Sequence, residues 1–304
     1  MNITKTDIMK ITRLAAIDVG SNAIRLLINT IYDDGTQRTF NKTSLVRAPV
    51  RLGHDAFVAE HISDENQERL VKAMKAFSLL MDVYQVRDYR AFATSAMREV
   101  GNSKEVIEKI KNKANIDLQV IDGETEGNII FETELKTYVN DNKNYLYVDV
   151  GGGSTECTLL ANGEVVTTRS FPVGTVRWLH NKVGADFLEK EVKPWIIENC
   201  KDYKDIELLG SGGNINHIFK QSGNKTGKPL SYLYLYKQLK ILKGLSFEDR
   251  LTLYNMKTDR ADVIIPALEI YVSIMKFANS KKIHVPKIGL SDGMIQFMYH
   301  HNTY

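Results

Sequence analysis

The chain has 304 residues, of which 43% are hydrophobic and 25% charged, a composition typical of a globular protein long enough to form two cores. No apolar run approaches the roughly 20 residues that cross a bilayer, and the segment before Arg13 is too polar for a signal peptide, so we expect a cytosolic protein without a membrane partner. The two cysteines, Cys157 and Cys200, have neither CxxC nor zinc-type spacing, which excludes a disulfide framework and a structural zinc site. The net charge of +3 is too small to indicate a nucleic-acid partner.

Two distant segments of the chain share one pattern. Asp18-Val-Gly and Asp149-Val-Gly each end an apolar run rich in branched residues, and each is followed by further apolar runs. The runs cover residues 14–20 and 24–31, and then 145–151, 156–160 and 165–171. This arrangement predicts a strand, a glycine turn and a second strand, formed twice by an internal duplication of one α/β unit.

Between these strands, apolar residues recur at helical spacing. The predicted helices cover residues 66–84, 104–114, 125–139 and 186–197, further candidate strands cover 89–93, 118–121 and 206–209, and 231–278 is expected to be mainly helical. Strands that alternate with helices predict an α/β fold with mixed sheets. We place the domain boundary so that the two domains cover residues 1–125 and 126–304.

Both glycine turns have a composition suited to phosphate. Glycines followed by small hydroxyl residues leave backbone amides open to an anion, and nearby amide or guanidinium groups add donors. The candidate phosphate-binding residues are Ser21, Asn22 and Arg25 after the first turn, and Gly151, Gly152, Gly153, Ser154 and Thr155 in the second. A plain hairpin explains one such turn equally well, but two turns that each follow an acid at a strand end predict a pair of phosphate loops.

Three carboxylates lie at strand ends beside these turns. Asp18, Asp149 and Glu156 are hard oxygen ligands, which suit Mg²⁺ held by a few carboxylates, several waters and the substrate's own phosphates. Without a cation they would repel phosphate. The alternative is that Asp18 and Asp149 cap the turns by accepting backbone N–H bonds.

Transfer of a phosphoryl group to water also requires a residue that positions or deprotonates the water. Glu124 and Glu126 offer carboxylates at the start of a predicted helix, beside the domain boundary. By chemistry alone either one could instead be an ordinary first-turn glutamate favoured by the helix dipole.

Further donors come from three other segments. Ser95 and Arg98 follow a predicted strand, where an α/β sheet presents its binding groups. Gly212 and Gly213 belong to a third glycine turn, which either binds another phosphate or allows close helix packing. No carboxylate lies between Glu207 and Glu248, and the lysines of this stretch either attract a polyanion or form a solvated face. The lysines singled out as substrate contacts are Lys220, Lys225 and Lys228.

Together these segments resemble the exopolyphosphatase and guanosine pentaphosphate phosphohydrolase (Ppx/GppA) family, within the superfamily of actin, sugar kinases and heat-shock ATPases. The resemblance extends over residues 16–27, 93–98, 120–127, 149–156, 171–177 and 289–293. Its most specific part is Asn22 and Arg25 joined to the GGGSTE run that ends at Glu156.

The resemblance implies two ribonuclease-H-like (actin-like) domains with a cleft between them, in the short form of the family. The last helix, about residues 292–304, is expected to pack back on the first domain, and the family also implies bound Mg²⁺ and a homodimer. By position Glu126 resembles the water-activating carboxylate, with Glu156 beside it as a catalytic residue. Asp149 and Glu156, together with Asp18, resemble the magnesium site.

The chain departs from the family pattern at three positions. Thr175 stands where a cysteine is common, Asn214 where a threonine is usual, and Ser291 where an arginine often precedes the acidic-Gly pair. The phosphate loops are intact, so these departures concern the substrate beyond its reacting phosphate.

The expected function is therefore the release of terminal phosphate from inorganic polyphosphate by attack of water. The first alternative is removal of the 5′-terminal phosphate of guanosine pentaphosphate, which shares the terminal phosphoanhydride. The second alternative is a non-catalytic sensor of nucleotide or polyphosphate. Asn22, Arg25 and Glu126 argue against an actin-like phosphotransferase.

Overall fold

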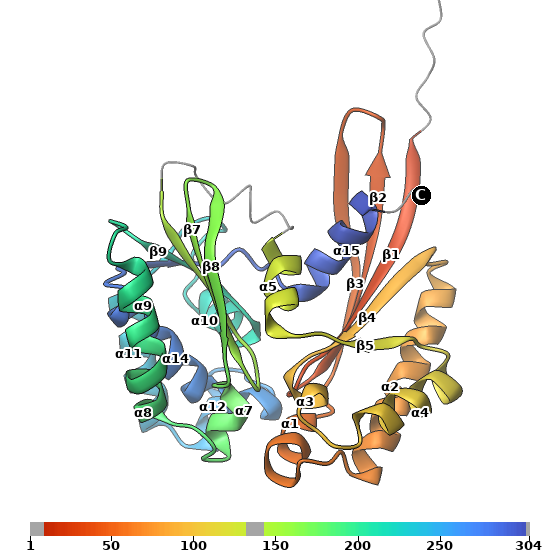
Figure 1. The fold of residues 1–304 in the computed structure, drawn as a ribbon, viewed down its shortest axis with the longest axis horizontal. Coiled ribbons are helices and arrows are strands. Elements are labelled where there is room, and N and C mark those ends of the chain that lie inside the picture. The colour runs from red at the N-terminus through yellow and green to blue at the C-terminus, as the bar shows by residue number, and fades with distance from the viewer. Residues whose placement is uncertain (1–8, 132–142, 302–304) are drawn as a thin grey trace, which may run out of the picture.

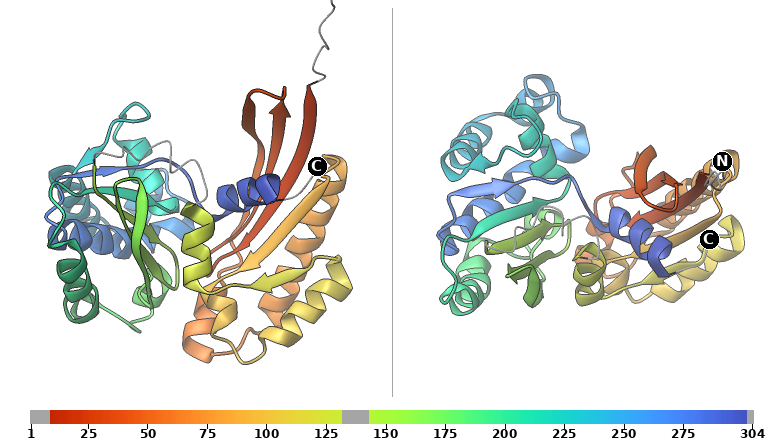
Figure 2. Two further views of the ribbon diagram at one scale, coloured as in Figure 1. Left: turned by 45° about the horizontal axis from the view of Figure 1, so that its top comes forward. Right: turned by 90° about the horizontal axis from the view of Figure 1, so that it is seen from above.

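The computed structural model describes residues 9–131 and 143–301, which form two α/β halves. Figure 1 shows them side by side, with the N-terminal half in red to yellow and the C-terminal half in green to blue. Each half contains one sheet with helices against it. The last described helix crosses back to the N-terminal half (Figure 2).

The first sheet has the strand order β3-β2-β1-β4-β5. Its strands are β1 (Lys10–Val19), β2 (Ile24–Asp33), β3 (Arg38–Ala48), β4 (Asp88–Ala93) and β5 (Leu118–Val120). β1 pairs with β2 in antiparallel and with β4 in parallel orientation. Since β1 is central and covered on both faces, its inner part is a nearly continuous apolar run, which made it visible in the sequence.

The second sheet repeats the pattern of the first. Its strands are β6 (Tyr145–Val150), β7 (Thr155–Ala161), β8 (Glu164–Phe171), β9 (Glu207–Ser211), β10 (Leu230–Ser231) and β11 (Lys282–His284). β8, β7 and β6 are antiparallel neighbours, and β9 and β11 follow β6 in parallel, as β4 and β5 follow β1. The duplication expected from the two Asp-Val-Gly segments is confirmed, and β10 adds an antiparallel edge.

The helical segments of the first half are α1 (Leu52–His54), a π-helical turn (Asp55–Ala59), α2 (Asp64–Val83), α3 (Ser95–Arg98), α4 (Ser103–Ala114) and α5 (Gly123–Phe131). Of these, α2 and α4 pack on one face of the sheet, in a buried cluster with Ala15, Ile17 and Val19 of β1. The predicted helices 66–84 and 104–114 correspond to α2 and α4. The predicted helix 125–139 begins earlier, in α5, and its part beyond residue 131 lies outside the described residues.

The second half is mainly helical in its last third, as expected. Its helices are α7 (Thr175–Leu179), α8 (Ala185–Phe187), a π-helical segment (Leu188–Val192), α9 (Lys193–Cys200), α10 (Gly213–Gln221), α11 (Tyr232–Gly244), α12 (Phe247–Thr252), α13 (Thr258–Ala261), α14 (Ile264–Phe277) and α15 (Leu290–His301). The helix predicted over 186–197 is thus three consecutive helical segments. Among the described residues no helix is long and apolar enough to cross a membrane.

The last helix, α15, packs between α5 and the first sheet, against β1, β2 and β4. Leu290, Met294 and Met298 share a buried cluster with Leu14 and Leu27 of the sheet. The domain boundary at 125/126 falls within α5, which contacts both α15 and the strands β7 and β8 of the second half. That boundary stays a prediction.

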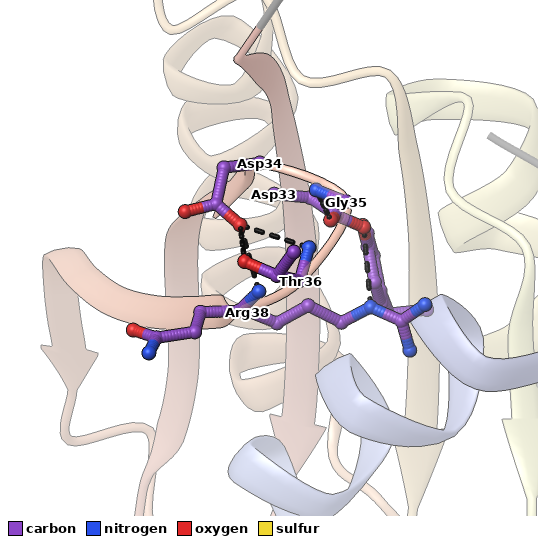
Figure 3. Close-up of polar contacts among 7 residues, drawn as sticks. Asp33, Asp34, Gly35, Thr36 and Arg38 are labelled. Atoms are coloured by element: carbon purple, nitrogen blue, oxygen red, sulfur yellow. Dashed lines mark hydrogen bonds and ion pairs between the residues drawn. The ribbon is translucent and has the colours of Figure 1, made fainter. Parts of the chain in front are cut away.

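The β2–β3 turn fastens the far end of α15 (Figure 3). Asp33 Oδ1 accepts the N–H of Gly35 at 2.9 Å, and Asp34 Oδ1 accepts the hydroxyl of Thr36 at 2.7 Å. Arg38 Nε donates to Asp33 Oδ2 at 3.1 Å, and the Tyr299 hydroxyl donates to the same oxygen at 2.6 Å. Turn carboxylates of this kind replace missing backbone bonds, and here one of them also binds the C-terminal helix.

Close packing of α15 on α5 gives a test of this arrangement. A Cβ on Gly293 would lie 2.8 Å from the carbonyl carbon of Ile129, so Gly293→Ala forces the two helices apart. We expect this overpacking to lower the free energy of unfolding by about 1–3 kcal/mol in urea titrations. Gly244→Ala, at a helical glycine with no atom within 4 Å of the added Cβ, is the matched control and should change stability little. Equal effects of the two changes would contradict tight packing at Gly293.

Candidate active site

A cavity of about 330 Å³ lies between the two halves, and residues from both form its wall. Of the predicted site residues, the wall includes Asp18, Ser21, Asn22, Arg25, Ser95, Glu126, Asp149, Gly151, Gly152, Ser154, Glu156, Gly212 and Gly213. Residues far apart in the chain are therefore brought together as the sequence predicted. Arg98, Gly153, Thr155, Lys220, Lys225 and Lys228 lie outside the wall.

The two glycine turns touch each other at the base of the cavity. A Cβ on Gly152 would lie 2.9 Å from the Cβ of Ser21 and 3.3 Å from the backbone nitrogen of Asn22. A Cβ on Gly174 would lie 2.5 Å from the backbone of Gly152. Only glycine fits at such approaches, and the turns therefore present backbone rather than side chains to one another. The hydroxyls of Ser21 and Ser95 form a hydrogen bond of 3.0 Å beside this contact.

Two of the predicted residues stand behind the second turn. Thr155 is fully buried, and its hydroxyl donates to the carbonyl of Val173 at 2.5 Å. Gly153 packs on Ser95 and Phe57 with no room for a Cβ. Both residues therefore stabilise the turn by packing and hydrogen bonding and do not line the cavity.

The third glycine turn lies beside the acid of the second half. Gly212 has φ +112°, and a Cβ there would lie 3.3 Å from Asp149 Oδ1 and 3.0 Å from the carbonyl of Val150. Gly212, Gly213 and Asn214 all line the cavity. The turn is therefore tightly packed and also lines the cavity, and phosphate binding there stays a prediction.

Sheet register places the acids symmetrically at the two turns. Asp18 of β1 lies opposite Arg25 of β2, and Asp149 of β6 lies opposite Glu156 of β7. Arg25 Nη1 donates to Asp18 Oδ2 at 3.3 Å. Glu156 is buried, and its Oε1 accepts the hydroxyl of Ser154 at 2.6 Å.

Glu126 completes a group of four carboxylates. It lies in the first turns of α5, and its Oε2 is buried without a hydrogen-bond partner among the described residues. Glu124, two residues earlier, is exposed and outside the wall. The structure therefore separates two glutamates that residue chemistry alone left as equal alternatives, and Glu126, the one favoured by the family resemblance, is the one in the wall.

Burial raises the pKa values of all four carboxyl groups. Burial raises the pKa of Asp18, which the charge of Arg25 opposes, and burial likewise raises that of Asp149. Burial raises the pKa of Glu156 to about 7, against the lowering effect of the Ser154 hydroxyl. For Glu126, burial and then the charges of Glu156 and Asp149 raise the pKa well above its ordinary value. A bound cation would reverse these shifts.

Magnesium suits this donor set. Among the described residues no three His, Cys, Asp or Glu side chains converge closely enough to hold a metal ion by themselves. Mg²⁺ does not require that, because it keeps several waters and takes phosphate oxygens as ligands. Buried carboxylates gather at Asp18, Asp149 and Glu156, with the unsatisfied oxygen of Glu126 nearby. A hydrated Mg²⁺ would neutralise their charge.

Basic residues that sequence reasoning missed lie in the same wall. Arg47 of β3 forms an ion pair with Asp259 of α13, and Asn22 Nδ2 donates to the carbonyl of Asp259 at 2.8 Å. Arg260 donates to the carbonyl of Gly213. Burial lowers the pKa of Arg260, with Arg47 close by. Arg47 could have been found only by predicting β3, and no glycine turn or strand end marks Arg260.

Arg98 acts on the site from outside the wall. Its Nη1 donates to the carbonyl of Ile121 at 2.7 Å, at the start of the connection to α5. Its charge also opposes the upward pKa shifts of Glu126 and Glu156. The geometry makes it a fixed positive charge behind the carboxylates.

The sequence of this chain matches a known family over most of its length. A sequence model of the Ppx/GppA phosphatase family matches residues 32–302. The chain belongs to the Ppx/GppA phosphatase family. Membership confirms the resemblance seen in the motifs and the prediction of a hydrolase acting on phosphoanhydride bonds.

Curated Ppx/GppA relatives differ in how much of them the chain covers. Exopolyphosphatase 1 of Mycobacterium leprae is 23% identical over 303 residues, which cover 93% of this chain and 88% of that protein. A bifunctional 3-dehydroquinate synthase/phosphatase of Fusobacterium nucleatum is 32% identical over 206 residues, 64% of this chain. The match takes in only 31% of that bifunctional enzyme.

Solved structures confirm the two-domain α/β fold. An exopolyphosphatase from Cytophaga hutchinsonii superposes with a TM-score of 0.85 at 24% identity, covering 96% of this chain and 99% of the other. A Ppx/GppA family member from Aquifex aeolicus gives a TM-score of 0.74 at 22% identity, covering 97% of this chain and 100% of the other.

The raised pKa of Glu156 predicts how stability depends on pH. Its folded-state pKa of about 7 lies above its ordinary value of 4.5, so the neutral form stabilises the fold below about pH 4.5 and this contribution is lost as the pH rises through 7. In metal-free buffer, Glu156→Gln should match the wild type near about pH 4 and exceed it in free energy of unfolding above about pH 7, by up to about 3 kcal/mol. Urea titrations across this range measure the difference.

Glu164→Gln, on the exposed edge of β8, is the control and should follow the wild type at every pH. A Glu156→Gln variant that also follows the wild type at every pH would show that Glu156 titrates normally.

Proposed function

We propose that this chain is a magnesium-dependent exopolyphosphatase, which releases the terminal phosphate of inorganic polyphosphate by attack of water. The observation that carries the proposal is the contact of the two glycine turns at Gly152 and Ser21, with carboxylates from both halves around it. The relatives named exopolyphosphatase support the substrate. The cytosolic location and the homodimer remain predictions.

The wall residues at the two glycine turns have distinct roles in this reaction. The amides of Gly151 and Gly152, with the hydroxyl of Ser21, would bind the oxygens of the terminal phosphate. Arg25 would add a guanidinium on the side of the first turn. Mg²⁺, beside Asp149 and Glu156, would neutralise phosphate charge and polarise the phosphoryl group.

We assign to Glu126 the role of taking the proton of the attacking water. Its Oε2 is buried in the wall without another partner among the described residues, and so remains available as an acceptor. Burial raises the pKa of its carboxyl, and a general base works best when its pKa is near the operating pH. The charges of Arg98 and the bound cation would keep enough of it ionised.

One feature of the wall favours the alternative substrate, guanosine pentaphosphate. Leu45 is 61% exposed although it belongs to the cavity wall, next to Leu27 in the sheet. An exposed apolar side chain at this place would suit a nucleoside better than a further phosphate. Phosphate release from each substrate at equal concentration, with Mg²⁺, decides between the two: release mainly from the nucleotide would reject the exopolyphosphatase proposal.

Replacing Glu126 tests the mechanism for either substrate. Glu126→Ala should lower turnover by a factor of about 100 or more while substrate still binds, as expected when a general base is removed. Phosphate release measures turnover, and calorimetry with inorganic triphosphate measures binding. Glu124→Ala is the matched control, since it removes an exposed carboxylate from the same helical turn.

Near wild-type turnover in Glu126→Ala would reject Glu126 as the base. Binding without Glu126-dependent release from any substrate would favour the non-catalytic sensor instead.

The lysines outside the cavity offer a test of polyphosphate as substrate. Lys220, Lys225 and Lys228 are all exposed, and their charge reaches a ligand only over distance. Changing the three to glutamate should raise the KM for long chains more than that for inorganic triphosphate, because distant anionic units lose attraction. The effect should shrink as salt is added.

The control changes three exposed lysines of the first half to glutamate, so that the net charge changes by the same amount. These lysines are Lys72, Lys75 and Lys104. If both sets alter long and short chains alike, the lysines of the second half form an ordinary solvated face.

A further inference from the structure

The register of the first sheet divides the cavity wall into successive rows. Asp18, Arg25 and Arg47 lie side by side on β1, β2 and β3 and form the row nearest the glycine turns. All three line the cavity. This charged row belongs to the reacting end of the substrate.

The next row along the strands offers no charge. It consists of Ala16, Leu27 and Leu45, which pair across the same three strands. Leu27 and Leu45 line the cavity. A phosphate chain that passes this row finds no donor from the sheet there.

An irregularity in β3 brings a cation to the third row. The β2–β3 register shifts between Ile28 and Asn29, so that Lys42 rather than Thr43 lies opposite Asn29. Such a bulge turns a residue to the other face of a strand. Lys42 thereby joins the face of Arg25 and Leu27, and it lines the cavity. At about 3.4 Å per residue, this row lies about 14 Å from the arginine row along β2.

Lys42 is held there by Asp292 in the first turn of α15 and by Lys287 in the segment before it. Its Nζ lies 2.6 Å from Asp292 Oδ1 and donates to the carbonyl of Lys287 at 3.3 Å. Asp292 and Lys287 also line the cavity. The other carboxylate oxygen of Asp292 accepts the N–H of Gly289 at 3.1 Å, so Asp292 stays anchored to its own turn whether or not Lys42 is bound.

A second donor in the wall, on the residue before Asp292, has no hydrogen-bond partner among the described residues. Ser291 is 7% exposed, lines the cavity, and its hydroxyl lacks a hydrogen-bond partner among the described residues. A buried hydroxyl without a partner is costly unless a ligand or water satisfies it. An oxyanion beside Lys42 would accept from this hydroxyl.

We propose that Lys42 and Ser291 form a second phosphate site at the outer end of the cavity, and that Asp292 occupies Lys42 until a phosphate of a longer chain replaces it. The proposal rests on the proposed exopolyphosphatase function. The ammonium group of Lys42 is accessible, since its side chain is 48% exposed, and a carboxylate on a lysine is a weaker and less charged ligand than phosphate. Because the apolar row separates the two sites, a triphosphate held at the glycine turns gains nothing from Lys42, and a long chain does.

Binding of inorganic triphosphate and of long-chain polyphosphate by calorimetry, with Mg²⁺ and in the Glu126→Ala background that prevents turnover, tests this selectivity. Lys42→Gln should weaken long-chain binding about fivefold and leave triphosphate binding unchanged. Asp292→Asn keeps the bond to Gly289 and frees Lys42, so it should strengthen long-chain binding by a similar factor. Asp117→Asn, which breaks an exposed Lys111–Asp117 pair on the first half, is the matched control.

Equal effects of Lys42→Gln on both ligands, or a loss of long-chain binding in Asp292→Asn, would overturn the second site. A parallel assay of phosphate release by the protein with Glu126 intact separates this from the proposed function. Release from guanosine pentaphosphate alone would reject the exopolyphosphatase proposal, while the binding measurements still decide whether Lys42 holds a distal phosphate.

Discussion

The close approach of two glycine turns is the constraint on which this site depends. At Gly152 the backbone of the second half meets Ser21 and Asn22 of the first with no space for a Cβ. The contact fixes the ends of β1 and β6 beside one another, because each turn directly follows its strand. Asp18 and Asp149 are positioned by those two strand ends. A side chain at Gly152 would push the two halves apart.

Electrostatic strain is the consequence of that contact. The duplicated pattern places one acid before each turn, and the pairing of β6 with β7 adds Glu156 opposite Asp149. With Glu126 from α5, four carboxylates share a cavity of about 330 Å³, and the pKa of each is raised. Such a cavity repels phosphate when it is empty and attracts it when a cation is bound, which would couple binding of metal and substrate.

Positive charge in the cavity lies both beside the glycine turns, at Arg25 and Arg47, and at the outer end, at Lys42. Arg25 forms an ion pair with Asp18, Arg47 with Asp259, and Lys42 with Asp292. Each of these cations already has a carboxylate partner, so a polyanion gains only the difference between phosphate and carboxylate at each position. This explains how a cavity with several basic residues can still discriminate by where along the substrate its phosphates lie.

The sequence predicted the parts of this structure that local pattern determines. β1 and β6 are buried central strands, so their apolar runs were visible, and the acids and glycines at their ends marked the turns. β3 was missed because it is an edge strand with mostly exposed, polar residues, and Arg47 and Lys42 were missed with it. Residue chemistry alone did not separate Glu126 from Glu124; the family resemblance favoured Glu126, and the orientation of α5 puts only Glu126 in the cavity wall. Lys220 was assigned to the substrate from charge alone, although it lies outside the cavity wall.

The most direct test of the account is the fate of solvent oxygen during turnover. In heavy-oxygen water with Mg²⁺ and inorganic polyphosphate, attack of water on the terminal phosphorus predicts one labelled oxygen in each released phosphate and none in the shortened chain. Label in the shortened chain, or release of unlabelled phosphate, would contradict water attack at the terminal phosphate held by the two glycine turns.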